Sequence, residues 1–209
     1  MTLDELALKY QTDKGSQFHN YTRWYERHFR QFVGTNVTVL EIGICKSKSL
    51  LMWRDYFGPS ARIIGVDYSE EYCVAAQRLG FEVIHGAQED HGVMARIRGD
   101  FRPRIIIDDG GHQASAQQAT FDGLFPHMPN GGIYVIEDLH TAYLGWGGNF
   151  SAYLHKIVDG TTNRGVSSYG DLSYDPDGTA KLTPTERHMT ATHFYPNIVF
   201  IEKGDKAAR

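Results

Sequence analysis

The feature that most constrains the fold of this chain is a regular alternation of short apolar runs and helical segments from residue 37 onward. The runs are rich in Val and Ile without polar alternation, which is typical of strands buried on both faces. They lie at residues 37–42, 62–67, 81–86, 104–109 and 131–138. Segments with helical spacing separate them, at residues 49–57, 70–80, 88–98 and 112–128. This order predicts a doubly wound α/β fold around a parallel sheet.

The end of the chain departs from this alternation. Residues 189–195 and 197–203 flank a turn at Pro196 and Asn197 and predict a hairpin, which adds an antiparallel strand at one edge of a mostly parallel, seven-stranded sheet. The stretch 159–187 is rich in Gly, Ser, Thr and Asp and is predicted to be a long loop. A substrate-facing or assembly role and plain disorder are the two interpretations of such a loop.

The first 36 residues have a different character and are predicted to form an N-terminal helical segment, separate from a domain at 37–209. Residues 2–10 and 21–33 have helical spacing, and the polar residues 12–21 between them predict a loop. Because 21–33 is strongly aromatic, this helix could bury against a second copy of the chain, and a homo-oligomer is one expectation.

Charge and hydropathy argue against several classes of partner. The formal net charge is −4, which provides no basic excess for binding phosphate backbones, so no nucleic acid is expected. No apolar run approaches the roughly 18 residues that a membrane span needs. The opening residues carry acids and lysines where a signal peptide would be apolar. The chain has only two cysteines, which together with this opening predicts a cytoplasmic protein.

Acidic residues follow four of the predicted strands. They are Glu41, Asp67, the pair Asp108 and Asp109, and the pair Glu137 and Asp138. The carboxyl ends of the strands face the ligand crevice in open α/β sheets. Six carboxylates gathered there would repel one another, so a cation or a ligand with hydroxyl groups is expected beside them.

The first two strands predict a nucleoside site. Gly43 leaves room for a close backbone approach after the first strand, and Asp67 lies 26 residues after Glu41, where an acid typically accepts hydrogen bonds from ribose hydroxyls. The segment lacks the further glycines of a dinucleotide fingerprint and the lysine of a phosphate-binding loop. A nucleoside with a non-phosphate tail is therefore favoured. The alternative is an ordinary strand–helix–strand segment with solvated acids.

The last two acidic pairs predict a metal centre. Asp109, Glu137 and Asp138 supply carboxylate oxygens from adjacent strand ends, which suits Mg²⁺. His112 follows two glycines after Asp109, so its imidazole can reach the same crevice as a general base. The alternative is that Asp109 caps a helix and His112 is merely exposed.

The chain resembles a known family through an ordered set of motifs. They are TDKGSQFHNY (12–21), VTVLEIGICKSKSLLMWRDYF (37–57), GVDYSEE (65–71), IIIDDGGH (105–112) and GGIYVIEDLHTAY (131–143). The set resembles the metal-dependent class I S-adenosylmethionine O-methyltransferases, in particular the macrolide-sugar enzymes. This resemblance covers about residues 3–160 and implies a Rossmann-like class I methyltransferase fold. The larger macrolide enzymes carry an additional N-terminal domain, which this chain is expected to lack.

The resemblance also implies roles for individual residues. Asp109, Glu137 and Asp138 match the family's Mg²⁺ ligands, and His112 matches its general base. The residues implied in cofactor binding are Thr12, Lys14, Tyr21, Glu41, Gly43, Asp67, Gln88 and Asp108. The segment that carries Thr12, Lys14 and Tyr21 is expected to fold over the cofactor.

The sequence differs from the family's motifs at three places. Ser47, Lys48 and Ser49 replace a usual Gly-Gly-Ser, which puts the approach to the methionine moiety in question. Ala87 replaces an acid next to the predicted adenine contact, and Gly111 replaces a Ser before His112.

The function expected from this resemblance is S-adenosylmethionine- and Mg²⁺-dependent O-methylation of a sugar or a glycosylated natural product. One alternative changes the acceptor to another small-molecule hydroxyl, such as a phenol, a catechol or a phosphoramidate. Another is a non-catalytic subunit that binds the cofactor, favoured only by the departure at 47–49.

Overall fold

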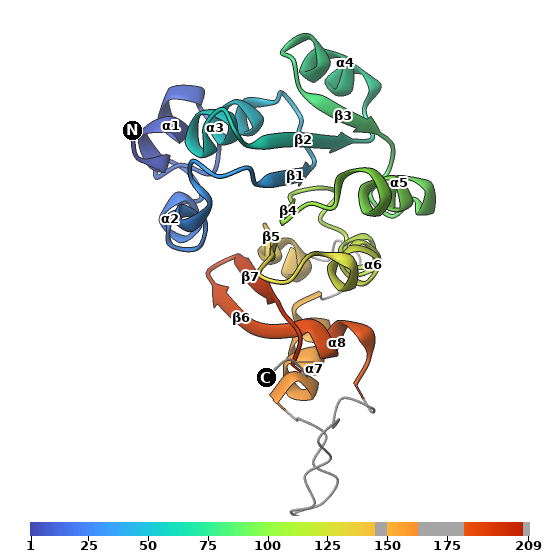
Figure 1. Ribbon diagram of the computed structural model, residues 1–209. Helices are drawn as coiled ribbons and strands as arrows, with labels where there is room; N and C mark the ends of the chain where they lie inside the picture. The colour runs from blue at the N-terminus through green and yellow to red at the C-terminus, as the bar shows by residue number, and fades with distance from the viewer. Residues whose placement is uncertain (145–149, 163–181, 207–209) are drawn as a thin grey trace, which may run out of the picture.

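The computed structural model describes residues 1–144, 150–162 and 182–206. Its centre is one seven-stranded sheet in the order β3-β2-β1-β4-β5-β7-β6 (Figure 1). The strands are β1 (Thr38–Ile42), β2 (Arg62–Asp67), β3 (Glu82–His85), β4 (Ile105–Asp108), β5 (Ile133–Ile136), β6 (Met189–Tyr195) and β7 (Ile198–Lys203). The first five are parallel, and β7 pairs antiparallel with both β5 and β6. The predicted fold class, sheet and hairpin are confirmed.

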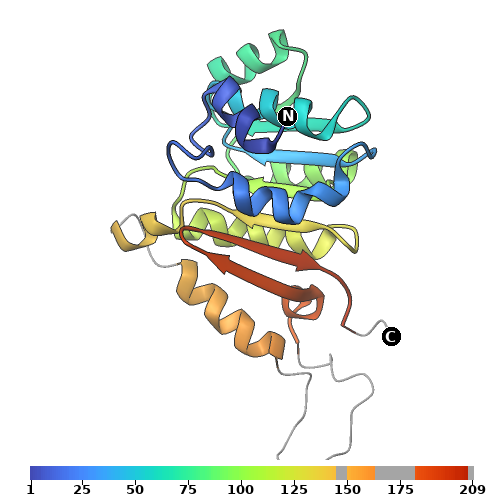
Figure 2. The same ribbon diagram turned by 90° about the vertical axis from the view of Figure 1, so that its left-hand side faces the viewer.

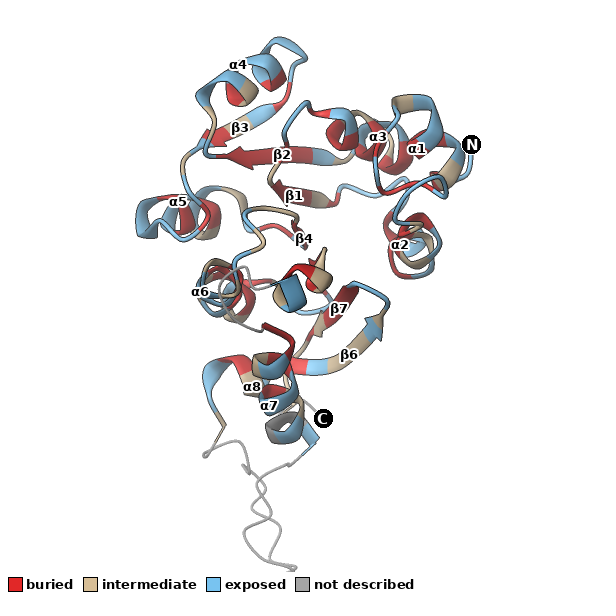
Figure 3. Cartoon of the chain, turned by 180° about the vertical axis from the view of Figure 1, so that it is seen from behind, coloured by how far each residue is buried: buried red, intermediate tan, exposed pale blue. Residues whose placement is uncertain are grey.

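Helices cover both faces of the sheet (Figure 2). Side chains of α1 (Leu3–Tyr10), α2 (Thr22–Phe29), α3 (Lys48–Phe57) and α4 (Glu70–Arg78) belong to one apolar cluster. Side chains of α5 (His91–Arg96), α6 (Ala114–Leu124) and α7 (Phe150–Thr162) belong to a second cluster, on the other face. A short helix, α8 (Pro184–His188), precedes the hairpin. Every residue of β4 and β5 is buried, and β1 and β2 are buried except at their first residues, as expected for a sheet covered on both faces (Figure 3).

The aromatic residues of α2 belong to the core of this chain. Tyr25 and Phe29 are fully buried, and the Tyr25 ring centroid lies 5.0 Å from that of Trp53 and 5.3 Å from that of Phe200. Trp24 stacks on Tyr195 with ring centroids 4.0 Å apart. The aromatic content of 21–33 is therefore explained by packing within the chain, and it no longer argues for a second copy.

The predicted loop at 159–187 is wrong at both of its ends. Residues 159–162 form the end of α7, and Pro184–His188 form α8. Thr183 caps α8 by a capping box with Glu186, a signal present in the sequence but not used. The middle of the predicted loop, residues 163–181, lies outside the described residues. Within the described residues, no helix has the length and apolar character to cross a membrane.

The sheet order places the functional edge. Neighbouring β1 and β4 send their following helices to opposite faces, so the chain opens a crevice beyond their carboxyl ends. Asp67 and Asp108 are the last residues of β2 and β4, and Glu137 follows the end of β5 directly. All the acids predicted from the strand ends therefore lie at one edge of the sheet.

A buried histidine makes the stability of this fold depend on pH. His28 packs on Phe200 with ring centroids 4.4 Å apart, and its Nε2 lies 3.1 Å from the Tyr195 hydroxyl. Burial, together with nearby His193 and Arg27 and against the attraction of Glu202, lowers the pKa of His28 to about 4. Between pH 6.5 and 4 the unfolded chain therefore takes up a proton that the folded chain does not, so the free energy of unfolding falls as pH falls.

We expect His28→Gln to remove about 1–2 kcal/mol of this pH-dependent loss between pH 6.5 and 4. The measurement is urea denaturation at each pH. His91→Gln, at an exposed position in α5, is the matched control and should leave the slope as in the parent. An unchanged slope in His28→Gln would show that other groups set the acid sensitivity.

Candidate active site

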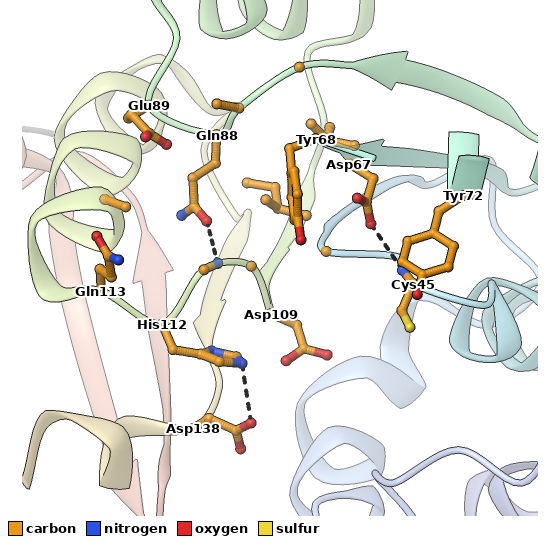
Figure 4. Close-up of a pocket in the computed structure, with 18 of the residues that line it drawn as sticks. Cys45, Asp67, Tyr68, Tyr72, Gln88, Glu89, Asp109, His112, Gln113 and Asp138 are labelled. Carbon is orange, nitrogen blue, oxygen red and sulfur yellow. Dashed lines mark hydrogen bonds and ion pairs between the residues drawn. The ribbon is translucent and has the colours of Figure 1, made fainter. Parts of the chain in front are cut away.

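A cavity of about 680 Å³ opens at the carboxyl ends of the parallel strands (Figure 4). Asp67, Tyr68 and Tyr72 line one end of it, and His112 and Asp138 line the other. A smaller cavity of about 270 Å³ is lined by Thr12, Lys14 and Lys48 among others. The two cavities share Asp13, Gly43, Cys45 and Asp109 as lining residues. Together they form one elongated site along the sheet edge.

Asp67 is held rigidly at its end of the larger cavity. One of its oxygens accepts hydrogen bonds from the backbone N–H groups of Ile44 and Cys45, both at 3.0 Å, and the other accepts from Ser69 N–H at 2.8 Å. A carboxylate offers about four acceptor positions, so at least one is left for a ligand. Because Asp67 lines the cavity, this position suits a hydroxyl group of the ligand.

The structure gives a different reason for the glycine at position 43 from the one predicted. Its φ is +83°, and a Cβ there would lie 2.0 Å from the carbonyl oxygen of Asp109. The close backbone approach is therefore between the loops that follow β1 and β4, rather than only toward a ligand. Gly43 still lines both cavities, and its lack of a side chain lets the Asp109 loop sit against β1.

Gln88 fastens the loop that carries Asp109 and His112. Its amide nitrogen donates to Asp108 at 3.1 Å and to Thr120 at 3.1 Å, and its oxygen accepts from Gly111 N–H at 2.8 Å. Both amide protons are thereby engaged, although Gln88 lines the larger cavity. Asp108 is fully buried, accepts from Tyr134 as well, and is not among the residues that line either cavity. Burial raises the pKa of Asp108 to about 6.

The centre of the site is an ammonium group surrounded by carboxylates. Lys14 Nζ lies 2.6 Å from Asp109 Oδ2, 2.8 Å from Glu137 Oε1 and 3.5 Å from Glu41 Oε1. Lys14, Glu41 and Glu137 are each at most 2% exposed. Burial opposes the charge on Lys14, but the attraction of Asp109, Glu137 and Glu41 outweighs it and raises the pKa of Lys14 well above its usual value. Burial likewise raises the pKa of Glu41 to about 7, although Lys14 opposes the shift.

A second group of side chains surrounds Asp138. The Tyr21 hydroxyl donates to Asp138 Oδ1 at 2.7 Å, and His112 Nε2 lies 3.6 Å from Asp138 Oδ2. His112 and Asp138 both have left-handed backbone, with φ of 51° and 56°. Residues held in such conformations concentrate at functional sites, because the surrounding structure must stabilise the strain. In Figure 4 the two side chains point toward each other across the end of the cavity.

The residues present fit a divalent cation. One ligand atom each from Asp109, His112 and Asp138 lie within 4.8 Å of one another, and the same holds for Glu41, Asp109 and Glu137. Asp109 belongs to both groups and joins them. Lys14 pairs with three of these carboxylates, whereas Asp138 makes no ion pair with a lysine or arginine among the described residues, so a cation there would balance negative charge. Carboxylate oxygens are the ligands that Mg²⁺ prefers.

The departure at 47–49 has a structural explanation. Ser47 adopts a left-handed conformation with φ of 60°, and Lys48 Nζ donates to the carbonyl of Gln11 at 3.2 Å. Ser49 donates to Glu41 at 2.7 Å. These residues connect the loop after β1 to the N-terminal segment and to the carboxylate cluster.

Two contacts of the site were not predicted from the sequence. Tyr25 donates a hydrogen bond to Glu137, and Lys14 pairs with the predicted metal ligands themselves. The signal available was the i,i+4 spacing of Tyr21 and Tyr25, which places both hydroxyls on one side of α2 and its N-cap. Both reach the acidic pair after β5. Of the predicted site residues, four line neither cavity: Tyr21, Glu41, Asp108 and Glu137.

Comparison with known proteins identifies relatives over nearly the whole chain. It is 37% identical over 219 residues to 8-demethyl-8-(2-methoxy-alpha-L-rhamnosyl)-tetracenomycin-C 3'-O-methyltransferase from Streptomyces olivaceus, covering 97% of this chain and 54% of the relative. It is 35% identical over 212 residues to demethylmacrocin O-methyltransferase from Streptomyces fradiae, covering 97% and 53%. The chain thus spans about half the length of the curated relatives it matches. No family model matches it.

Solved structures agree with these relatives. The MycE methyltransferase from the mycinamycin biosynthetic pathway, in complex with Mg, SAH and mycinamycin VI, superposes with a TM-score of 0.82 at 32% identity. The superposition covers 98% of this chain and 54% of that one. A second crystal form of that protein, in complex with Mg and SAH, gives a TM-score of 0.83 at 33% identity, covering 98% and 54%.

The carboxylate cluster predicts a strong dependence of stability on Lys14. Lys14→Met should lower the free energy of unfolding by about 3–5 kcal/mol in EDTA, because it leaves buried carboxylates without their cation. Urea denaturation measures the effect. Lys9→Met is the matched control: Lys9 makes one exposed ion pair, with Asp55 at 2.8 Å, and its loss should change the free energy of unfolding far less. Equal losses in the two variants would contradict the role assigned to Lys14.

Proposed function

Because the chain has the class I methyltransferase fold and is homologous over nearly its whole length to part of the sugar O-methyltransferases of antibiotic pathways, we propose that it methylates a sugar hydroxyl of a glycosylated natural product. The methyl donor would be S-adenosylmethionine, and Mg²⁺ the metal. One observation carries the proposal: Asp109, His112 and Asp138 gather at one end of a cavity whose other end presents Asp67.

The cofactor-binding residues divide into two sets by their geometry. Asp67 and Gly43 line the larger cavity, where Asp67 would accept hydrogen bonds from the ribose hydroxyls. Thr12 and Lys14 line the smaller cavity beside it. The second set would position other site residues, because its polar groups form hydrogen bonds to them; it comprises Tyr21, Glu41, Gln88 and Asp108. The N-terminal segment 1–36 would cover the cofactor through the loop that carries Lys14.

Asp109, Glu137 and Asp138 would hold the metal; Asp109 and Asp138 line the larger cavity, and Glu137 is buried and lines neither cavity. A bound Mg²⁺ lowers the pKa of a coordinated hydroxyl and orients it for attack. Lys14 would keep Asp109 and Glu137 in place, and Tyr21 would do the same for Asp138. The strained backbone at Asp138 turns its carboxylate toward His112.

His112 would take the proton of the acceptor hydroxyl at Nε2. The oxygen then bonds to the methyl carbon as the sulfonium–methyl bond breaks, and the electron pair of that bond neutralises the sulfur. Asp138, 3.6 Å from Nε2, stabilises the imidazolium that forms. Gly110 and Gln88 fix the loop on which His112 is carried, since a Cβ at Gly110 would lie 2.0 Å from Gln88 Oε1. These contacts orient the base before the acceptor arrives.

We expect turnover to depend on metal. Methyl transfer from S-adenosylmethionine to a rhamnoside, followed by mass spectrometry, should cease in EDTA and return with Mg²⁺. Asp138→Asn should raise the Mg²⁺ concentration for half-maximal turnover by at least about tenfold. The matched control, Asp100→Asn, alters an exposed carboxylate far from the site and should leave this concentration unchanged. Full activity of metal-free protein would contradict the metal assignment.

His112→Ala should lower kcat by about 10²–10⁴-fold, the usual contribution of a general base. The melting temperature and the calorimetric affinity for S-adenosylhomocysteine should change little, because His112 contributes little packing. His127→Ala, at an exposed position after α6, is the control and should keep the parent's kcat. If His112→Ala retains most of its kcat, the base lies elsewhere, with His140 the next candidate.

A further inference from the structure

A third cavity, of about 190 Å³, lies at the same edge of the sheet and takes no part in the site described above. Its walls come from the turn after β5, from the start of α7 and from the end of the β6–β7 hairpin. They include His140, Tyr143, His155, Phe194, Tyr195 and Asn197. In Figures 1 and 2, α7 runs alongside the hairpin that supplies the last three of these residues.

This cavity is linked to the proposed metal ligand Asp138 through His140, which is part of its wall. His140 follows Asp138 by two residues, and its Nδ1 lies 4.0 Å from Asp138 Oδ1. Leu139, also in the wall, donates its N–H to the carbonyl of Asn197 at 2.9 Å. Thr141, on the same turn, donates to the carbonyl of His112 at 3.3 Å. An acceptor whose hydroxyl meets His112 would therefore lie close to the turn that forms one wall of this cavity.

The walls combine aromatic faces with hydrogen-bonding groups. Phe194 is 40% exposed and Tyr143 is 72% exposed, and the His155 ring lies 5.6 Å from that of Phe194. The Tyr143 hydroxyl and Ser151 Oγ lie 3.3 Å apart. Large apolar side chains left exposed together, among polar groups, mark binding surfaces. Pockets for whole ligands measure about 300–1,000 Å³, so a cavity of about 190 Å³ suits a single ring.

We propose that this cavity binds the ring that carries the methylated sugar, that is, the first ring on the aglycone side of a glycoside acceptor. The proposal rests on the proposed function and adds which part of the acceptor is recognised and by which residues. Phe194 and His155 would stack on the ring, and Tyr143 and Asn197 would meet its polar substituents.

A pair of glycosides tests this assignment by binding alone. The probes are 4-nitrophenyl α-L-rhamnopyranoside and methyl α-L-rhamnopyranoside, titrated by calorimetry into protein saturated with S-adenosylhomocysteine and Mg²⁺. The parent should bind the nitrophenyl glycoside at least about tenfold more tightly than the methyl glycoside. Phe194→Ala and, separately, His155→Ala should reduce this ratio to near one, with little change in the affinity for the methyl glycoside or for S-adenosylhomocysteine.

Leu79→Ala is the matched control, since it truncates an exposed apolar side chain beside β3 at the far edge of the sheet. It should keep the parent's ratio. Equal affinities of the parent for the two glycosides, no binding of either, or a ratio that survives both substitutions would overturn the proposal. A different result would contradict the proposed function, namely no binding of S-adenosylhomocysteine, or methyl transfer that requires neither Mg²⁺ nor His112.

Discussion

The site depends on one buried ammonium group. Lys14 lies within 3.5 Å of Glu41, Asp109 and Glu137, which come from the ends of three neighbouring strands, β1, β4 and β5. Without it, these carboxylates would repel one another in a region of low dielectric constant. The sheet order brings the acids together, and the lysine makes their proximity tolerable. A divalent cation would then balance the negative charge that Lys14 leaves uncompensated.

Much of the fold and part of the site could be predicted from the sequence. The alternation of apolar runs with helical segments predicted the sheet, and acids at the strand ends predicted the functional edge, because both are local patterns repeated along the chain. Asp67, Asp109, His112 and Asp138 were identified in this way, and all four line the larger cavity. The hairpin was predicted from two apolar runs and the turn residues between them.

Other features could not be predicted, because long side chains or tertiary packing decide them. Lys14 lies in a polar loop, and nothing in that loop indicates that its ammonium group enters a cluster of carboxylates that lie 27, 95 and 123 residues further along the chain. Gln88 matched a cofactor motif, yet its amide bonds fasten the loop of His112. The aromatic residues of α2 predicted an interface only because the sequence does not show that Trp53 and Phe200 complete their packing.

The hydrogen bonds of Tyr21 to residues far along the chain affect when the site forms during folding. Tyr21 bonds to Asp138 and to the carbonyl of Asn197, contacts that span 117 and 176 residues of sequence. Contacts of such separation form late, because a long stretch of chain must be ordered before they are made. On the ribosome, Lys14 and Tyr21 are synthesised before Asp109, Glu137 and Asp138, which follow β4 and β5, and before Asn197 in the hairpin. The complete site therefore arises only after β7 has been synthesised, because a chain that lacks β7 has no Asn197 carbonyl to accept the hydrogen bond of Tyr21.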